Sequence, residues 1–119
     1  MGLDCGVLDG AGFDSAAGLK IMGGKADRYA KLLQKFADRE SGIVSEIRAA
    51  LEAGDNPTAE RAAHSLKGSA STLGANALAE RAADAETAIK SGRCVDEALE
   101  TLSESLRITV SAIRDAVTE

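Results

Sequence analysis

The sequence predicts an all-α protein, an up-down-up-down four-helix bundle with a short extra helix on its N-terminal side. The composition is the first reason, because the 119-residue chain has one Pro and 3% aromatic residues, and helix-favouring residue types dominate. The second reason is that apolar residues recur at steps of three and four through most of the chain. The third is that no segment alternates between apolar and polar residues over a useful length, so no strand is expected.

The N-terminal region is predicted to contain a leader followed by one short helix. Residues 1–12 hold four Gly and show no periodicity, so we expect a flexible leader before a bundle that spans residues 13–119. Asp14 is suited to cap a helix N-terminus, and the helix would end at the Gly pair 23–24. The side chains available for burial on this helix are Leu19, Ile21 and Met22.

The next helix is expected to be long. Apolar side chains in residues 26–53 form one stripe without a Pro, although Gly42 weakens the pattern. Gly54 would end this helix, and Asn56 followed by Pro57 predicts a cap and a first turn for the following one. The stripe comprises Tyr29, Leu32, Leu33, Phe36, Ile43, Val44, Ile47 and Leu51.

Three more helices complete the predicted bundle, at about residues 58–73, 77–91 and 95–117. Gly74 and Gly92 would end the first two, and Asn76 would cap the second. The last helix has a heptad-like apolar seam. Because the connecting turns are short, sequential helices are expected to be antiparallel neighbours. The seam consists of Val95, Leu99, Leu102, Leu106, Thr109, Ile113 and Val117.

The charge of the chain argues against a nucleic-acid partner. The net charge is -5, whereas a nucleic-acid-binding domain presents a basic face. A basic excess occurs in residues 56–75, where Arg61 and Lys67 outnumber Glu60, so an acidic partner suits this segment. No apolar run approaches the ~20 residues of a membrane span, so no membrane contact is expected.

The two cysteines indicate a reducing compartment. Cys5 and Cys94 lie far apart in the sequence and neither belongs to a CxxC motif, so we expect free thiols and a cytoplasmic protein. With one His in the chain and no paired Cys, no zinc cluster can be built from the usual ligands.

The third predicted long helix carries the candidate functional site. At ~100° per residue its core stripe is formed by Ala59, Ala62, Ala63, Leu66, Ala70 and Leu73. The only imidazole of the chain, His64, therefore points away from the core, amid Arg61, Lys67, Gly68 and Ser71. A Gly inside a helix costs about 1 kcal/mol relative to Ala, so Gly68 is either a tolerated surface residue or a notch through which a partner reaches the imidazole.

The segment from His64 to Ala75 reads HSLKGSASTLGA and resembles the motif of histidine-containing phosphotransfer (HPt) domains of two-component phosphorelays. The resemblance extends over roughly residues 13–117. It implies that His64 is phosphorylated through Nε2, that Lys67 helps to hold the phosphoryl oxygens and that Gly68 keeps the approach open.

The resemblance also directs attention to the following helix, where Glu86 and Lys90 correspond to a neutral polar residue and a basic residue in some family members. Glu86 departs from that pattern. Its carboxylate would accept the imidazole Nδ1 proton and orient the ring, but it would repel a phosphoryl group close to it. We expect Glu86 and Lys90, together with Arg61 and Ser71, to contribute to partner docking.

The implied function is that of a phosphocarrier which relays a phosphoryl group between receiver-domain aspartates and has no kinase activity of its own. The expected partners are response-regulator receiver domains and a parent hybrid sensor kinase. No cofactor is expected in this chain, because Mg²⁺ belongs to the receiver. Residues 18–25 are no P-loop, since the spacing of Gly18 to Gly24 is too long and Ala26 replaces the Mg²⁺-binding Ser or Thr.

Two alternatives remain open at this point. The chain is also compatible with the phosphoacceptor domain of a chemotaxis-type histidine kinase, which shares the motif but is phosphorylated by its own kinase domain. It is equally compatible with a non-catalytic helical interaction module in which His64 is incidental. For the phosphocarrier, a monomer is expected.

Overall fold

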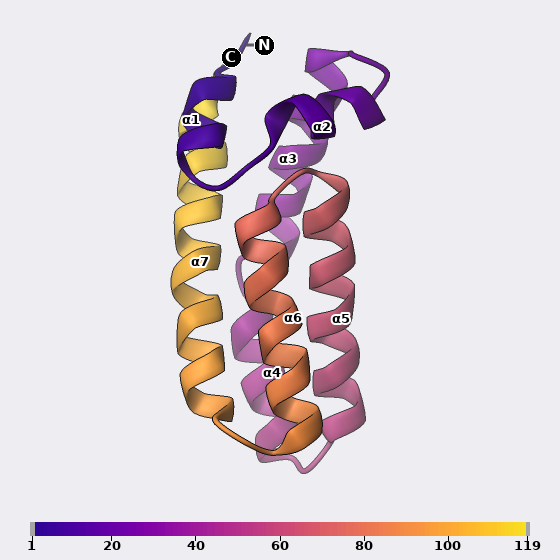
Figure 1. Cartoon of the computed structure of the whole chain (residues 1–119), viewed down its shortest axis with the longest axis vertical. Coiled ribbons are helices and arrows are strands. Elements are labelled where there is room, and N and C mark those ends of the chain that lie inside the picture. The colour runs from indigo at the N-terminus through magenta and orange to yellow at the C-terminus, as the bar shows by residue number, and fades with distance from the viewer. Residues whose placement is uncertain (1, 119) are drawn as a thin grey trace.

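The computed structural model describes residues 2–118, which form seven helices and one two-stranded sheet (Figure 1). The long helices make four columns: α3 and α4 together form one column, and α5, α6 and α7 form the other three. The elements are β1 (Gly2–Leu3), α1 (Cys5–Gly10), α2 (Ser15–Ile21), α3 (Ala26–Glu40), α4 (Ile43–Glu52), α5 (Asn56–Thr72), α6 (Asn76–Ser91), α7 (Val95–Ala116) and β2 (Val117–Thr118). The prediction of an all-α helical bundle is confirmed.

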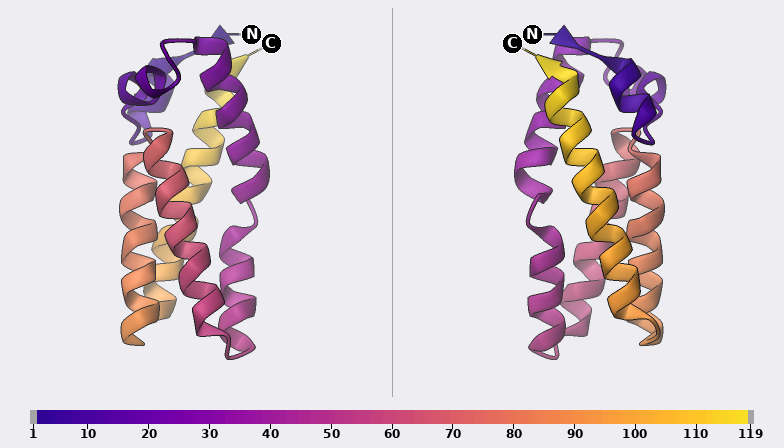
Figure 2. Two further views of the ribbon diagram at one scale, coloured as in Figure 1. Left: turned by 90° about the vertical axis from the view of Figure 1, so that its right-hand side faces the viewer. Right: turned by 90° about the vertical axis from the view of Figure 1, so that its left-hand side faces the viewer.

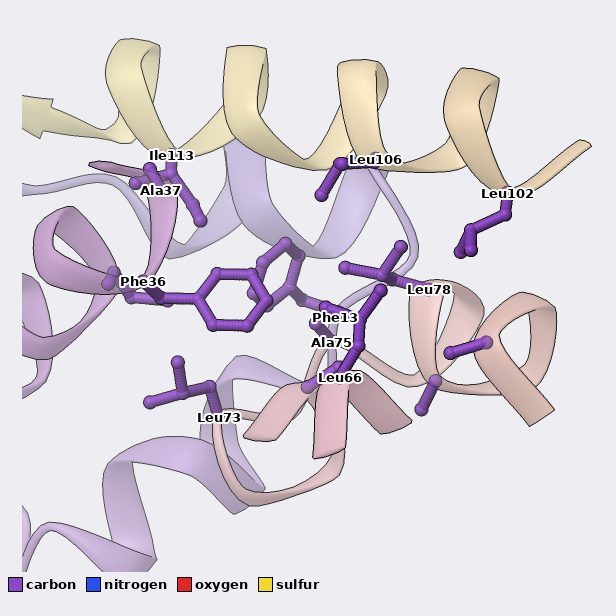
Figure 3. Close-up of a cluster of buried hydrophobic side chains, with 14 of the residues drawn as sticks. Phe13, Phe36, Ala37, Leu66, Leu73, Ala75, Leu78, Leu102, Leu106 and Ile113 are labelled. Carbon is purple, nitrogen blue, oxygen red and sulfur yellow. The ribbon is translucent and has the colours of Figure 1, made fainter. Parts of the chain in front are cut away.

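The core lies between the four columns and is built from the predicted stripes. Leu66 of α5, Leu73 at the end of that helix, Leu78 of α6 and Ile113 of α7 converge on Phe36 of α3 (Figure 3). All of them are buried. Burial of apolar surface stabilises the fold by roughly 25 cal/mol per Å². The helices therefore pack with their apolar stripes turned toward one another.

In the segment expected to be a flexible leader, residues 2–10 instead form a strand and a short helix, and residue 1 lies outside the described residues. Asp4 caps α1 by accepting a hydrogen bond from the Val7 amide, and Leu8 is completely buried in the core. Strand β1 pairs with β2 in antiparallel fashion, and the Asp4 amide donates to the Ala116 carbonyl over 2.8 Å, so residues 2–4 and 116–118 lie together (Figure 2). A six-residue helix with one buried Leu is too short to show periodicity in the sequence. The two strands come from distant parts of the chain, so their pairing could not be predicted from a local pattern either.

The helix predicted over residues 26–53 is two helices. Helix α3 ends at Glu40 and α4 begins at Ile43, with Gly42 at the N-cap of α4 (Figure 2). The unfavourable helix propensity of Gly explains the position of the break, which the continuous apolar stripe did not indicate.

The caps follow local chemistry with some corrections. The carboxylates of Asp14 and Asp55 accept hydrogen bonds from the Ala17 and Thr58 amides, so Asp55 and not Asn56 caps α5. Ala75 occupies the N-cap of α6, so the prediction of Asn76 as its cap was wrong. Gly54, Gly74 and Gly92 have positive φ at the helix ends, as predicted.

Burial on α2 also differs from the prediction. Met22 is buried, but Ile21 is 59% exposed, and the helix turns its small residues Ser15 and Gly18 toward the protein. Cys5 is half-buried, Cys94 is exposed and neither forms a disulfide. None of the helices within residues 2–118 combines the length and the apolar character that crossing a bilayer requires.

Candidate phosphoryl-acceptor site

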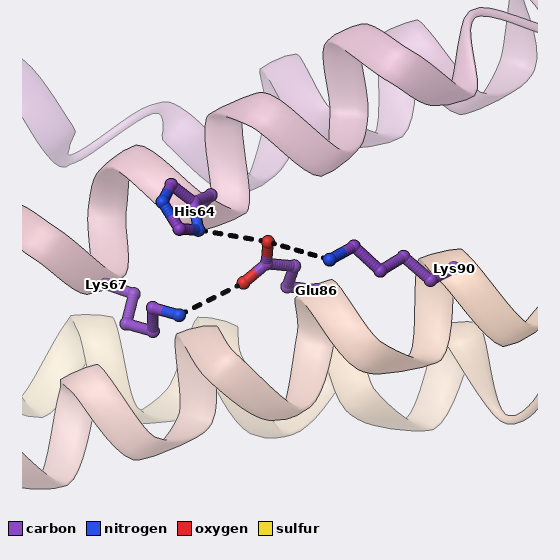
Figure 4. A network of polar contacts seen from close by, with 4 residues as sticks. All are labelled: His64, Lys67, Glu86 and Lys90. Atoms are coloured by element: carbon purple, nitrogen blue, oxygen red, sulfur yellow. Dashed lines mark hydrogen bonds and ion pairs between the residues drawn. The ribbon is translucent and has the colours of Figure 1, made fainter.

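Helices α5 and α6 pack closely because their facing sides are built from alanine. A methyl side chain lets two helix backbones approach, so longer side chains at the edge of the interface can reach across to the neighbouring helix. This arrangement brings His64 and Lys67 of α5 next to Glu86 and Lys90 of α6 (Figure 4). The buried alanines of the two helices are Ala59, Ala63 and Ala70 on α5 and Ala79, Ala82, Ala85 and Ala88 on α6.

The carboxylate of Glu86 is the centre of this cluster. Its Oε2 lies 3.0 Å from His64 Nδ1 and 3.4 Å from Lys90 Nζ, and its Oε1 accepts a hydrogen bond from Lys67 Nζ over 3.4 Å. Glu86 is only 8% exposed, whereas the side chains of His64 and Lys90 are 63% and 60% exposed. A buried carboxylate is therefore surrounded by groups that face the solvent.

The two lysines keep Glu86 ionised. Burial by itself would raise the pKa of this carboxyl group, but hydrogen bonds and charge interactions with Lys67 and then Lys90 outweigh burial and lower the pKa. An ionised carboxylate accepts hydrogen bonds and donates none. His64 Nδ1 must therefore carry a proton in this contact, and in the neutral form of the exposed ring the lone pair is then on Nε2.

Gly68 lies one turn after His64, and the space beside it is open. A Cβ atom added at this position would meet no heavy atom within 4 Å. A groove of about 600 Å³ borders Gly68 between α3 and α5. Its apolar lining consists of Met22, Leu32, Phe36 and Leu73, and its polar lining includes Lys35, Arg39, Ser65, Ser69 and Thr72.

The predicted site residues fall into two groups. His64, Lys67, Glu86 and Lys90 form one network, and Gly68 lies on the same exposed face of α5. In contrast, Arg61 and Ser71 are exposed residues outside that network. The groove residues on α3, such as Lys35 and Arg39, were missed, because only the packing of α3 beside α5 brings them next to Gly68.

No group of three or more His, Cys, Asp or Glu side chains within residues 2–118 is placed to hold a metal ion. The chemistry of the donor set at His64 agrees with this, because one imidazole and one carboxylate share their surroundings with two ammonium groups. The residues present suit an anion such as a phosphoryl group better than a cation.

Comparison with known proteins supplies the family. No significant match was found among curated proteins or among solved structures. The family model of the Hpt domain matches residues 31–118, which includes α4 to α7 and most of α3. Hpt domains take part in phosphotransfer in two-component systems and carry the phosphoryl group without kinase activity of their own. Since the match covers well over half of the chain and includes the whole His64 cluster, this protein belongs to the Hpt domain family.

Proposed function

We propose that this protein relays a phosphoryl group between receiver-domain aspartates through a phosphohistidine at His64 Nε2. The observation that carries the proposal is the 3.0 Å contact between His64 Nδ1 and the buried carboxylate of Glu86. This contact fixes the tautomer and orients the ring, so that the nucleophilic nitrogen faces the solvent. In-line attack on a phosphoaspartate then needs no deprotonation of the ring.

Lys67 and Lys90 supply the positive charge that the transferred group requires. In the unphosphorylated protein both ammonium groups pair with Glu86, at 3.4 Å each. Their side chains are 36% and 60% exposed, so both retain the freedom to turn toward phosphoryl oxygens on the neighbouring ring. A phosphoryl group carries up to about two negative charges at neutral pH and attracts such ammonium groups strongly.

The groove beside Gly68 is the docking surface that we propose for the receiver. Its apolar floor includes Phe36 and Leu73, and Lys35 and Arg39 lie in its polar lining. An apolar centre with charged surroundings is the usual composition of a protein interface. The basic groups complement the acidic pocket that holds the receiver's Mg²⁺ and aspartate, and Arg61 and Ser71 extend the same exposed side of α5.

The chain's partner supplies the remaining chemistry. We infer that Mg²⁺ is bound by the receiver and neutralises the phosphoryl group during transfer, while this chain contributes the nucleophile and the lysines. We further infer that the protein acts as a monomer in the cytoplasm, where its free thiols persist and its receiver partners are found.

Phosphate uptake from a phosphorylated receiver tests this function. The parent should acquire acid-labile phosphate in the presence of Mg²⁺, and His64→Gln should acquire none, because the chain contains no other His. Since the ring is exposed, the substitution should change the free energy of unfolding by no more than about 0.5 kcal/mol.

Two results would contradict the proposal. Acid-labile phosphate in the His64→Gln variant would exclude His64 as the acceptor. A parent that takes up phosphate from a histidine kinase domain with ATP but from no receiver would indicate the phosphoacceptor domain of a chemotaxis-type kinase instead. Circular dichroism of the variant serves as the control for folding.

A further inference from the structure

The negative charge of Glu86 favours the form of the His64 ring in which Nδ1 carries a proton over the form in which Nδ1 is bare. The contact between Oε2 and Nδ1 is a hydrogen bond only while Nδ1 carries a proton, because an ionised carboxylate has no proton to donate. A Gln in this position would serve either form, since its amide oxygen accepts from a protonated nitrogen and its NH₂ group donates to a bare one. Glu86 therefore favours the protonated ring nitrogen by charge as well as by geometry.

Burial makes this charge effective. Glu86 is 8% exposed, so water and salt screen its carboxylate only weakly. The titratable groups that meet at the Glu86 carboxylate are His64 and Lys67 on α5 and Lys90 on α6. Arg61 lies on the same exposed side of α5 as His64 and is outside this network. Within residues 2–118 no ion pair from another element reaches this cluster. Both lysines pair with the carboxylate, and its Oε2 remains in contact with the ring.

The proton on Nδ1 matters most after phosphorylation. When Nε2 attacks the phosphorus of an aspartyl phosphate, the N–P bond forms, the O–P bond breaks and the bonding pair leaves with the carboxylate. The ring then carries both the phosphoryl group and the Nδ1 proton, with a positive charge. In the reverse transfer or in hydrolysis, the N–P pair returns to Nε2 and the ring leaves as neutral imidazole. Without the Nδ1 proton it would have to leave as a strongly basic imidazolide.

We propose that Glu86 keeps Nδ1 protonated after Nε2 is phosphorylated, and so holds the phosphoryl group in a readily transferred form at neutral and mildly alkaline pH. The inference rests on His64 being the phosphoryl acceptor, as proposed above. Glu86 is in this sense a positioning residue, because it acts on the phosphoryl group through the ring.

The pH profile of phosphohistidine hydrolysis tests the proposal without a partner protein. Parent and Glu86→Gln are phosphorylated with phosphoramidate. The phosphoryl group is transferred to Nε2, the P–N bond of the reagent breaks, and its nitrogen departs as ammonia. Loss of phosphohistidine is then followed by ³¹P NMR from about pH 5.5 to pH 9. The pH at which the hydrolysis rate falls to half of its low-pH value should be about one unit lower in Glu86→Gln. At pH values well above the parent's midpoint, the phosphohistidine of the variant should therefore live about tenfold longer.

The controls separate this role from others. Glu80→Gln removes the same charge from an exposed residue of α6 that pairs with Arg81, and its profile should match that of the parent. The second variant is Glu86→Met, because Met is similar in length to Glu and has no proton acceptor of comparable strength. Its midpoint should shift in the same direction as that of Glu86→Gln, which excludes an effect peculiar to the amide. Circular dichroism confirms that each variant is folded.

Each outcome has a distinct meaning. A rate that changes by the same factor at every pH would show that Glu86 only anchors the lysines, and would overturn the inference while leaving His64 as the acceptor. Identical profiles in parent and Glu86→Gln would overturn it as well. A parent that forms no phosphohistidine would refute the proposed function, and the inference would fall with it.

Discussion

Gly18 in α2 and Gly68 in α5 both lie inside helices with ordinary backbone angles, but their surroundings are opposite. A Cβ atom at Gly18 would lie 2.6 Å from the Leu73 carbonyl oxygen and would also collide with the ring of Tyr29. A Cβ atom at Gly68 would meet nothing. The first glycine permits a close approach within the fold, whereas the second leaves space for something outside it.

The region around Gly18 joins the N-terminal segment to the turn between α5 and α6. The Tyr29 hydroxyl donates to the Leu73 carbonyl over 2.5 Å, and the Asp14 amide donates to the Gly74 carbonyl over 2.8 Å. Burial of Tyr29 raises the pKa of its hydroxyl, so that it remains a donor well above neutral pH. We therefore expect this region to contribute more to the stability of the fold than the exposed face that carries His64.

The largest effect that we expect comes from placing Ala at both glycines. Gly18→Ala forces Tyr29 or the Leu73 backbone to move and should destabilise the protein by about 1–3 kcal/mol, as overpacking does. Gly68→Ala is the matched control, and it should stabilise the protein by up to about 1 kcal/mol, because Ala favours the helix and meets no obstacle. Denaturant titration measures both changes. Equal effects of the two substitutions would refute the contrast.

A larger residue at Gly68 sharpens the comparison from the functional side. Gly68→Gln should fold at least as stably as the parent, because the added side chain extends into open space. It should slow phosphoryl transfer from a receiver at least about tenfold, since the side chain obstructs the groove between α3 and α5. Lys67→Ala should retain receiver binding in calorimetry and lose part of the rate. If Gly68→Gln binds and transfers like the parent, the open space at Gly68 has no role in docking.

The parts of the fold that depend on residues close together in the sequence were predictable. The stripes from Tyr29 to Ile47 and from Leu99 to Ile113 predicted the buried faces correctly, and glycines predicted the helix ends. The order in residues 2–10 was not predictable, because it depends on Leu8 meeting the core and on β1 pairing with β2 across the whole length of the chain. The break at Gly42 left the apolar stripe intact, so periodicity gave no indication of it.

The site was predictable to the extent that one helix determines it. Helical geometry placed His64, Lys67 and Gly68 on the exposed side of α5 correctly. The position of Glu86 next to His64 was expected from the resemblance, but its contacts with both lysines depend on side-chain conformations at the α5–α6 interface. The groove depends on how α3 packs against α5, and such nonlocal packing leaves no short motif in the sequence.

The smallest effect that we expect is on the stability of the protein in acid. It tests whether the cluster around Glu86 contributes to the stability of the fold. The folded-state pKa of Glu86 is lower than its usual value of 4.5, because the lysine contacts outweigh the effect of burial, which by itself raises it. Its ionisation therefore stabilises the protein fully above about pH 4.5, and this contribution is lost as the pH falls through the lower folded-state value.

In Glu86→Gln the contribution is missing at every pH, so parent and variant should differ in melting temperature by about 2 °C at neutral pH and should converge as the pH falls through the folded-state pKa of Glu86. The small size follows from the exposure of Lys90 and His64, since ion pairs that reach the solvent add little to stability. The control is Glu100→Gln on α7. Glu100 is exposed and forms no ion pair within residues 2–118, so this variant should follow the parent at every pH. A neutral-pH difference much larger than that of Gly18→Ala would mean that the His64 cluster holds the bundle together, and the division between a stabilising region and a functional region would then be wrong.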